Sequence, residues 1–258
     1  MSKKIGLALS GGGARGFTHV GVLKVLAEHG IRFDMIAGTS AGSVVGAALA
    51  SGMSPAEIET MARRVGWLNT MRPSFGLSGM LSTVPMGKFL TRELHATRFE
   101  DLKTPFAAVA YDLAAGEEVV FKDTGDLISA VRASCAVPGV FTPIRDKAGR
   151  VLVDGGVSSV MPTDAVWAMG ADVVIAVDLL KCGGTFRHSP RTALSIAVRS
   201  ALTLIRSTSN NQTRPADLVI EPQIAHLRPD QIGKIDEFIP LGEAAARSRI
   251  DEILALIY

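Results

Sequence analysis

The chain has 258 residues, of which 47% are hydrophobic and 20% are charged, and its formal net charge is +2 at pH 7. This composition is typical of a globular protein and excludes the disordered and fibrous classes. A chain of this length can bury one substantial core, so we expect a single domain over residues 1–258. The small charge and the lack of a dense Lys/Arg cluster argue against a nucleic-acid partner.

The two cysteines, Cys135 and Cys182, are too few for a disulfide framework and lie in no metal-ligand spacing. We therefore expect buried thiols and no metal site. The N-terminus lacks the apolar core of a signal peptide, and no apolar run approaches the roughly 18 residues that span a bilayer. The expected location is the reducing cytoplasm, for a soluble protein.

The chain begins with a buried-strand pattern over residues 5–9, a glycine-rich loop, and a helix that ends near Gly30. The loop contains G-x-G-x-x-G, which is the dinucleotide-binding fingerprint in this setting. A dinucleotide site also needs an acid at the carboxyl end of the second strand, whereas Asp34 lies at the opposite end of that strand. We therefore expect no cofactor. The loop comprises Gly11, Gly12, Gly13, Ala14, Arg15 and Gly16.

A second short strand, over residues 35–37, runs into G-x-S-x-G and then into a small-residue helix over 43–50 that Gly52 closes. A serine on a sharp strand-to-helix turn is strained, and flanking glycines avoid clashes with the strand and the helix. The serine hydroxyl is then exposed, and the helix N-terminus favours a negative intermediate there. Five residues alone are equally compatible with a plain turn. This elbow comprises Gly38, Thr39, Ser40, Ala41 and Gly42.

The next segment contains the clearest helix start. Ser54-Pro55-Ala56-Glu57 is a capping box and predicts a helix through Arg64. Regularity then fails over 65–83, where large apolar residues are scattered among Gly, Ser, Asn and Pro. That segment is either a mobile cover over an apolar site or a packed loop. A helix over 85–94 follows.

Strands alternate with helices through the chain, which indicates an α/β fold with three α/β/α layers and a mainly parallel central sheet. Residues 106–111 and 117–121 are expected to add an antiparallel hairpin, and the prolines of the 132–143 loop exclude helix there. The remaining expected elements are helices over 126–133, 162–169, 192–207 and 242–257, strands over 151–153, 173–177 and 218–221, and a loop over 182–190.

The glycine loop suits an oxyanion hole. In a parallel sheet the ends of the first two strands lie side by side, so the amides of Gly12 and Gly13 are expected to face the Ser40 hydroxyl. One such donor contributes roughly 10²–10³ in rate. Arg15 is expected to hold the loop, to contact a phosphate, or to be a plain surface arginine.

Ser40 also needs a base. Only two histidines, His188 and His226, follow Asp154, and neither lies at a strand end. Asp154 ends an apolar strand, and two glycines after it are expected to leave its surroundings open. A carboxylate within hydrogen-bond reach accepts the serine proton directly, especially if burial raises its pKa. A structural turn is the alternative for the motif Asp154-Gly155-Gly156.

In chain order these motifs resemble the patatin-like phospholipase family over essentially the whole chain, and the bacterial branch related to the catalytic region of neuropathy target esterase is most similar. The matching parts are residues 11–16, 38–42, 133–138 and 154–156. The resemblance implies a Ser40–Asp154 dyad without histidine or metal, and hydrolysis of lipid esters through an acyl-enzyme. Ser10 departs from plant members, which often carry an acid there; this affects loop anchoring more than chemistry.

The sequence thus predicts a serine acyl hydrolase acting on lysophospholipids, phospholipids or fatty esters. Two alternatives remain: a regulatory or scaffolding member without turnover, and a thioesterase or acyltransferase with the same dyad. The apolar 65–83 segment and the slight positive charge favour transient contact with the inner membrane surface. The oligomeric state is left open.

Overall fold

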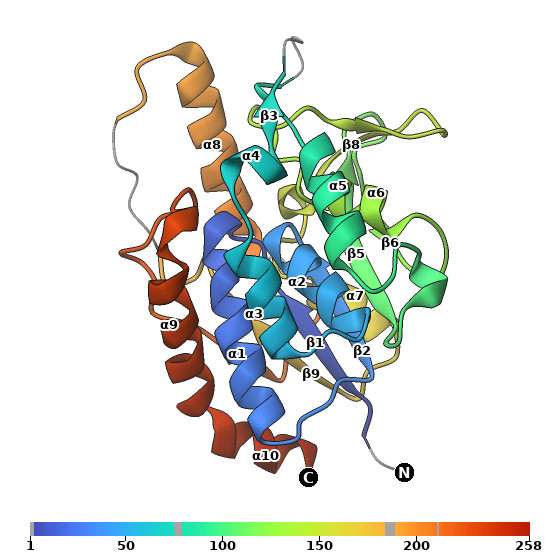
Figure 1. Ribbon diagram of the computed structural model, residues 1–258, viewed down its shortest axis with the longest axis vertical. Coiled ribbons are helices and arrows are strands. Elements are labelled where there is room, and N and C mark those ends of the chain that lie inside the picture. The colour runs from blue at the N-terminus through green and yellow to red at the C-terminus, as the bar shows by residue number, and fades with distance from the viewer. Residues whose placement is uncertain (1–2, 75–78, 184–188, 211) are drawn as a thin grey trace.

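The protein is built around an eight-stranded mixed sheet, described in a computed structural model that places residues 3–74, 79–183, 189–210 and 212–258 (Figure 1). Its strand order is β10-β9-β1-β2-β5-β8-β7, and β6 also pairs with β5. The strands from β10 to β5 are parallel, whereas β6, β7 and β8 are antiparallel to their neighbours. The strands are β1 (Ile5–Leu9), β2 (Met35–Thr39), β5 (Phe106–Asp112), β6 (Glu117–Phe121), β7 (Ile144–Arg145), β8 (Val151–Asp154), β9 (Val173–Val177) and β10 (Leu218–Ile220).

Helices cover both faces of this sheet, which confirms the expected α/β layers. Successive strand residues point to opposite faces. Leu7 and Ile36 therefore belong to the large core beneath α1, α2, α3, α5, α6 and α9, whereas Ala8 and Ala37 pack with α7 on the other face. In the described part of the chain, no helix is long and apolar enough to cross a membrane. The helices are α1 (Phe17–Glu28), α2 (Ala41–Ala50), α3 (Pro55–Arg63), α4 (Trp67–Thr70), α5 (Val84–Glu93), α6 (Leu127–Ser134), α7 (Thr163–Ala168), α8 (Ala193–Ser207), α9 (Ile235–Arg247) and α10 (Ile250–Ile257).

The helix boundaries that were predicted from a few adjacent residues, a glycine after the helix end or a capping box at the helix start, are confirmed. Helix α1 ends just before Gly30, whose φ of +70° favours glycine. Helix α3 begins with the expected capping box: the Glu57 amide donates to Ser54 Oγ at 3.3 Å, and the Ser54 amide donates to the Glu57 carboxylate at 2.7 Å. The 65–83 segment contains only α4 and a small hairpin of β3 (Arg72–Pro73) and β4 (Leu81–Ser82); residues 75–78 lie outside the described residues.

The single C-terminal helix predicted over 242–257 is wrong. The chain forms two helices there, and the first, α9, begins seven residues earlier and contains Pro240. Proline is normally a helix breaker because it lacks the amide proton and clashes with the preceding turn. Here the neighbouring Phe238 and Ile239 are buried in the main core. We attribute the continuation of the helix through Pro240 to this burial.

Helices α1 and α9 pack with almost no space between their backbones. A Cβ added to Gly21 would lie 2.0 Å from the carbonyl oxygen of Ile239, and a Cβ added to Gly242 would lie 2.1 Å from that of Thr18. Both distances are far below any real contact. The two glycines therefore set the close crossing of these helices.

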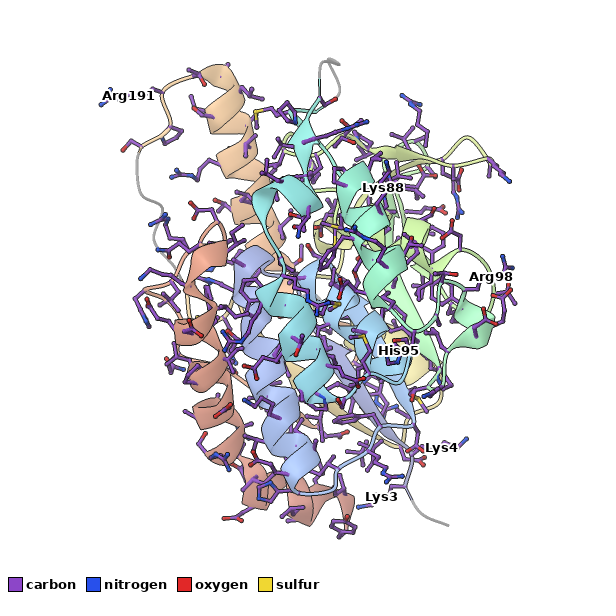
Figure 2. All side chains as sticks on the ribbon, viewed as in Figure 1. Lys3, Lys4, Lys88, His95, Arg98 and Arg191 are labelled. Carbon is purple, nitrogen blue, oxygen red and sulfur yellow. The ribbon has the colours of Figure 1, made fainter. Side chains whose placement is uncertain are left out.

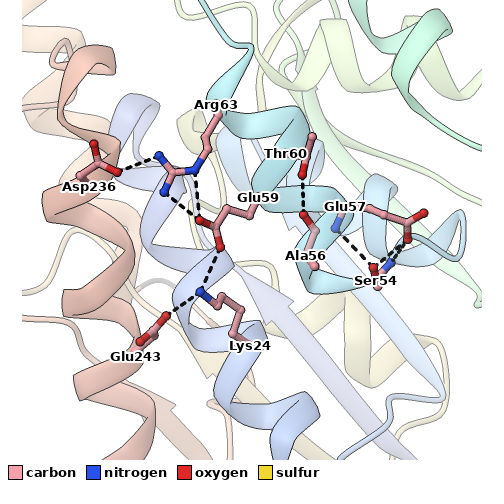
Figure 3. A network of polar contacts seen from close by, with 9 residues as sticks. All are labelled: Lys24, Ser54, Ala56, Glu57, Glu59, Thr60, Arg63, Asp236 and Glu243. Atoms are coloured by element: carbon pink, nitrogen blue, oxygen red, sulfur yellow. Dashed lines mark hydrogen bonds and ion pairs between the residues drawn. The ribbon is translucent and has the colours of Figure 1, made fainter.

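A network of ion pairs ties α3 to α1 and α9 (Figure 3). Lys24 Nζ lies 3.0 Å from Glu59 and 2.9 Å from Glu243, while Arg63 contacts Glu59 at 2.8 Å and Asp236 at 2.7 Å. The hydrogen bonds that Lys24 donates to Glu243 and Glu59 raise the pKa of Lys24. Single surface pairs stabilise little, but a network fixes the orientation of α3.

Candidate active site

Ser40 forms the turn that joins β2 to α2, and its backbone conformation is strained. Its φ of 53° and ψ of −124° lie in a region that non-glycine residues avoid. A Cβ on Gly42 would lie 2.1 Å from the carbonyl oxygen of Leu9, and one on Gly38 would lie 2.4 Å from the Gly42 carbonyl oxygen. Both flanking glycines are therefore required, as the elbow motif predicted.

Two hydrogen-bonded serines hold the Ser40 backbone in this conformation. Its amide donates to Ser134 Oγ at 2.8 Å, and its carbonyl oxygen accepts from the Ser43 amide at 2.8 Å and from Ser43 Oγ at 2.7 Å. Ser134 ends α6 and lies in the 133–138 block, to which the sequence assigned no contact. Its place beside Ser40 depends on the packing of α6, which no local sequence signal encodes.

Asp154 reaches Ser40 on an antiparallel strand. Thr39 pairs with Val109 on β5, and the next β5 residue, Ala110, pairs with Asp154 at the end of β8. Because β8 runs against β2, its last residue arrives at the carboxyl end of the parallel strands. From the sequence we expected the elbow and the Asp-Gly-Gly motif to lie close together, and the structure places them so. The sequence did not predict that β8, which brings Asp154 there, runs antiparallel to β5.

The carboxylate of Asp154 is buried and hydrogen-bonded. It is 2% exposed, it interacts with the Ser40 side chain, and it accepts from the Gly156 amide at 2.8 Å. Burial raises the pKa of Asp154 to about 6, although both hydrogen bonds act to lower it. A carboxyl with this pKa is ionised at neutral pH and is a stronger base than an exposed aspartate.

The expectation that Gly155 and Gly156 leave Asp154 in open surroundings is wrong. Both glycines are buried, and a Cβ on Gly155 would lie 2.3 Å from the carbonyl oxygen of Val109. A Cβ on Gly156 would lie 2.8 Å from a side-chain carbon of Ile205. These glycines allow close packing around the carboxylate, and this packing produces the raised pKa.

The glycine loop lies against the elbow with two backbone amides unused. A Cβ on Gly11 would lie 3.2 Å from the Ser40 Cβ, so the loop and the serine are adjacent. Within the described residues, no acceptor is present for the amides of Gly12 and Gly13. The other amides of the loop donate to the carbonyls of Val160, Pro229 and Gly12.

The Arg15 side chain anchors the glycine loop to backbone carbonyls outside the loop. It is buried, and its guanidinium donates to the backbone carbonyls of Leu227 at 2.9 Å, Leu179 at 3.1 Å and Gly183 at 2.8 Å. Among the three alternatives, the structure supports loop anchoring, and a plain surface arginine is excluded.

Ser10 and His19 anchor the start of the same loop. Ser10 Oγ accepts from the Leu179 amide at 2.9 Å, and His19 Nε2 lies 2.9 Å from the Ser10 carbonyl oxygen. Burial lowers the pKa of His19 to about 4, so the ring is neutral and donates this bond. His19 therefore supports the glycine loop and is not one of the reacting groups. Of the two histidines that follow Asp154 in the chain, His226 is exposed and His188 lies outside the described residues.

Ser40 and Asp154 line a cavity of about 410 Å³ whose walls are mostly apolar. Helices α2, α3 and α5 form one wall, and α8 contributes Leu202 and Ile205 to another. Met71 and Leu81, from the 65–83 segment, also line it. The first wall contains Val45, Ile58, Met61, Phe89 and Leu90.

Cys135 lies beside the two polar residues but is not activated. It is buried, and burial together with the charge of Asp154 raises the pKa of its thiol to about 12. The thiol therefore stays protonated at neutral pH. The expected buried thiol is confirmed here, whereas Cys182 is only half-buried; both are free.

The fold and this geometry define a mixed α/β protein with a serine at a strand-to-helix elbow and a buried aspartate beside it. The family model described as "Patatin-like phospholipase" matches residues 7–167. The chain belongs to the patatin-like phospholipase family.

Two curated relatives agree with this assignment. "Patatin-like phospholipase domain-containing protein 6" of Homo sapiens is 38% identical over 184 residues, which cover 68% of this chain and 13% of the relative. An "Uncharacterized NTE family protein" of Mycobacterium tuberculosis is 38% identical over 181 residues, covering 69% of this chain and 49% of the relative. The chain therefore matches half or less of the length of these relatives.

A solved structure shows the same fold. The crystal structure of VipD from Legionella pneumophila superposes with a TM-score of 0.59 and covers 98% of this chain and 67% of VipD, at 15% sequence identity. At this identity the likeness concerns the fold alone.

Proposed function

We propose that the protein is a serine acyl hydrolase of lipid esters in which Ser40 is the nucleophile and Asp154 is the general base. The observation that carries the proposal is that Ser40, on its strained elbow, and the buried Asp154 line the same apolar cavity. Family membership supports the reaction class, and the raised pKa of Asp154 supports its role.

In the first half-reaction, Ser40 Oγ attacks the ester carbonyl carbon while its proton passes to Asp154. The negative charge that develops on the carbonyl oxygen is stabilised by the amides of Gly12 and Gly13 and by the N-terminus of α2. The tetrahedral intermediate then collapses: the ester C–O bond breaks, and the leaving alcohol takes the proton back from Asp154. The acyl group remains on Ser40.

In the second half-reaction, water attacks the acyl-enzyme. Asp154 accepts a proton from this water, the oxyanion again lies against Gly12 and Gly13, and Ser40 leaves with the proton that Asp154 returns. The fatty acid is released and the starting state is restored. The strained elbow holds Ser40 Oγ toward the carboxylate throughout, so little reorganisation is needed between steps.

The cavity supports a fatty acyl chain as the substrate's apolar part. Its walls offer apolar side chains such as Ile58, Phe89 and Leu90, and apolar residues dominate the lining although Arg15, Arg206 and Asp230 also contribute to it. We propose lysophospholipids, phospholipids or simple fatty esters as substrates, met at the inner surface of a membrane. The cytoplasmic location stays a prediction. The two alternatives for the 65–83 segment, a mobile cover over the site or a packed loop, stay open.

The test is hydrolysis of nitrophenyl esters of increasing acyl length by the parent protein, by Ser40→Ala and by Asp154→Asn. The proposal predicts that kcat/KM rises with chain length until the cavity is filled, and that either substitution abolishes turnover. Turnover that survives both substitutions would exclude the dyad, and a folded parent without turnover would favour a scaffolding role. Measuring free fatty acid against acyl transfer to glycerol separates a hydrolase from an acyltransferase.

A further inference from the structure

Helix α8 exposes more large apolar side chains than any other helix in the described part of the chain. Leu194 is 53% exposed, Ile196 51% and Leu204 66%, and the removal of such side chains from water is favourable. Figure 1 shows α8 standing at the upper edge of the molecule, with its N-terminal end pointing away from the sheet. A helix end that exposes several large apolar side chains is unusual on a protein surface that contacts only water.

Only one side and one end of α8 pack against the protein. A Cβ on Gly139 would lie 2.9 Å from Val198, and Ile205 is buried against Gly156. At about 100° per residue, Leu194 and Ile196 point to nearly opposite sides of the helix. Apolar side chains therefore surround the protruding end, which suits insertion of that end into an apolar layer.

The charge around α8 is entirely positive in sequence. Residues 189–214 contain four arginines and no aspartate or glutamate, although the whole chain carries a net charge of only +2. Arg191 extends outward just before the helix begins (Figure 2). Arginines beside an exposed apolar end are the pattern of segments that bind anionic lipid surfaces. Arg191 and Arg199 belong to the protruding half, whereas Arg206 lines the cavity and the Arg214 guanidinium lies 3.4 Å from the centre of the Trp167 ring.

The C-terminal half of α8 borders the cavity that holds Ser40. Leu202 and Ile205 of α8 line that cavity, together with the 137–141 loop and the segment after α4. The exposed Met80 joins the same region, because its amide donates to the Val140 carbonyl at 3.1 Å. A surface bound at Leu194 would therefore lie about two helical turns, roughly 12 Å along the helix, from Leu202 in the cavity wall.

We propose that the N-terminal half of α8 is a membrane-docking element that inserts Leu194 and Ile196 into an anionic lipid surface while Arg191 and Arg199 contact the lipid phosphates. The binding itself is independent of the reaction. Its purpose, delivery of an acyl ester to the cavity beside Ser40, rests on the proposed function. The partner is the lipid surface, and a protein or a second copy of the chain is the competing occupant.

The experiment measures flotation of Ser40→Ala protein with vesicles of phosphatidylcholine, with and without phosphatidylglycerol, at low and high salt. Using Ser40→Ala keeps vesicle binding separate from turnover. The apolar variant adds Leu194→Ser and Ile196→Ser, and its control adds Leu113→Ser and Tyr258→Ser, which lie outside α8 and are 50% and 88% exposed. The charge variant adds Arg191→Gln and Arg199→Gln, and its control adds Lys3→Gln and Lys4→Gln at the opposite end of the molecule (Figure 2).

We expect binding to phosphatidylglycerol vesicles that weakens at high salt. The apolar variant should bind at least tenfold more weakly and the charge variant roughly 25-fold more weakly, since each of its two basic residues contributes about fivefold near such a surface. Both controls should bind like their parent. Circular dichroism and sedimentation velocity establish that each variant is folded and report its oligomeric state.

Two results would overturn the proposal: vesicle binding that is absent or unaffected by both variants, and a dimer of the parent that the apolar variant converts to a monomer. The second result would assign the helix to an interface between copies. Fluorophosphonate labelling of Ser40 in the parent protein, which carries no α8 substitution, tests the catalytic proposal separately. Labelling without vesicle binding would refute docking alone, and binding without labelling would refute the catalytic role alone.

Discussion

Replacing Asp154 by Asn should remove activity and, at neutral pH, make the protein more stable. The carboxylate is buried, and its pKa is raised from 3.8 to about 6 on folding. The folded state therefore holds a proton more tightly than the unfolded state does, and ionisation of Asp154 opposes folding. Asparagine occupies the same volume and accepts the Gly156 hydrogen bond without carrying charge.

The size of this effect follows from the pKa shift. A change of one pKa unit corresponds to about 1.4 kcal/mol, so a shift of about two units corresponds to a free energy on the order of 3 kcal/mol. Well below pH 3.8, Asp154 is protonated in both states, and the parent and Asp154→Asn should be equally stable. As pH rises from 4 through 6, the parent should lose stability relative to the variant, up to that difference by pH 7–8.

The assay is urea unfolding of the parent, Asp154→Asn and Ser40→Ala at half-unit steps from pH 4 to 8. Ser40→Ala is the matched control because it keeps the carboxylate but removes a hydrogen bond that lowers its pKa. Its loss of stability should therefore continue to higher pH than the parent's. A stability difference between the parent and Asp154→Asn that does not change with pH would refute the reasoning.

Three further predictions concern the site and the helix packing. The kcat/KM for a soluble ester should fall about tenfold per pH unit below pH 6, because protonated Asp154 cannot accept a proton; a flat profile from pH 5 to 8 would contradict this. Ser134→Ala leaves the Ser40 amide unpaired and should cost about 1–3 kcal/mol in urea unfolding, with slower fluorophosphonate inactivation, whereas unchanged values for both would show that this bond is dispensable. Gly21→Ala should destabilise by about 3 kcal/mol or more, because its Cβ would meet the α9 backbone, while Gly233→Ala, with open space around it, should be nearly neutral; equal unfolding midpoints would refute the close crossing.

The sequence predicted those parts of the fold whose conformation is set by residues adjacent in the chain. The elbow around Ser40, the capping box at Ser54 and the helix end at Gly30 each follow from backbone requirements of a few adjacent residues. The order of strands and helices was also predictable, because burial on both faces leaves apolar runs in parallel strands. These features required no knowledge of distant contacts.

Long-range packing accounts for what the sequence did not predict. The antiparallel direction of β8, the bond from the Ser40 amide to Ser134 and the burial of Arg15 all join residues that are far apart in the chain. Asp178 illustrates the ambiguity. It also ends a buried strand and burial raises its pKa, yet its carboxylate accepts from the amides at 180 and 181 and forms a turn. Only the proximity of Ser40 distinguishes Asp154.

The most direct test of the Ser40–Asp154 proposal is intact-mass spectrometry after treatment with a fluorophosphonate, applied to the parent, Ser40→Ala and Asp154→Asn at pH 8. We predict a single adduct on the parent that peptide mapping places on Ser40. We also predict no adduct on Ser40→Ala, and labelling of Asp154→Asn at least 100-fold slower although that variant is folded. An adduct that persists in Ser40→Ala, or equal labelling rates for the parent and Asp154→Asn, would contradict the dyad.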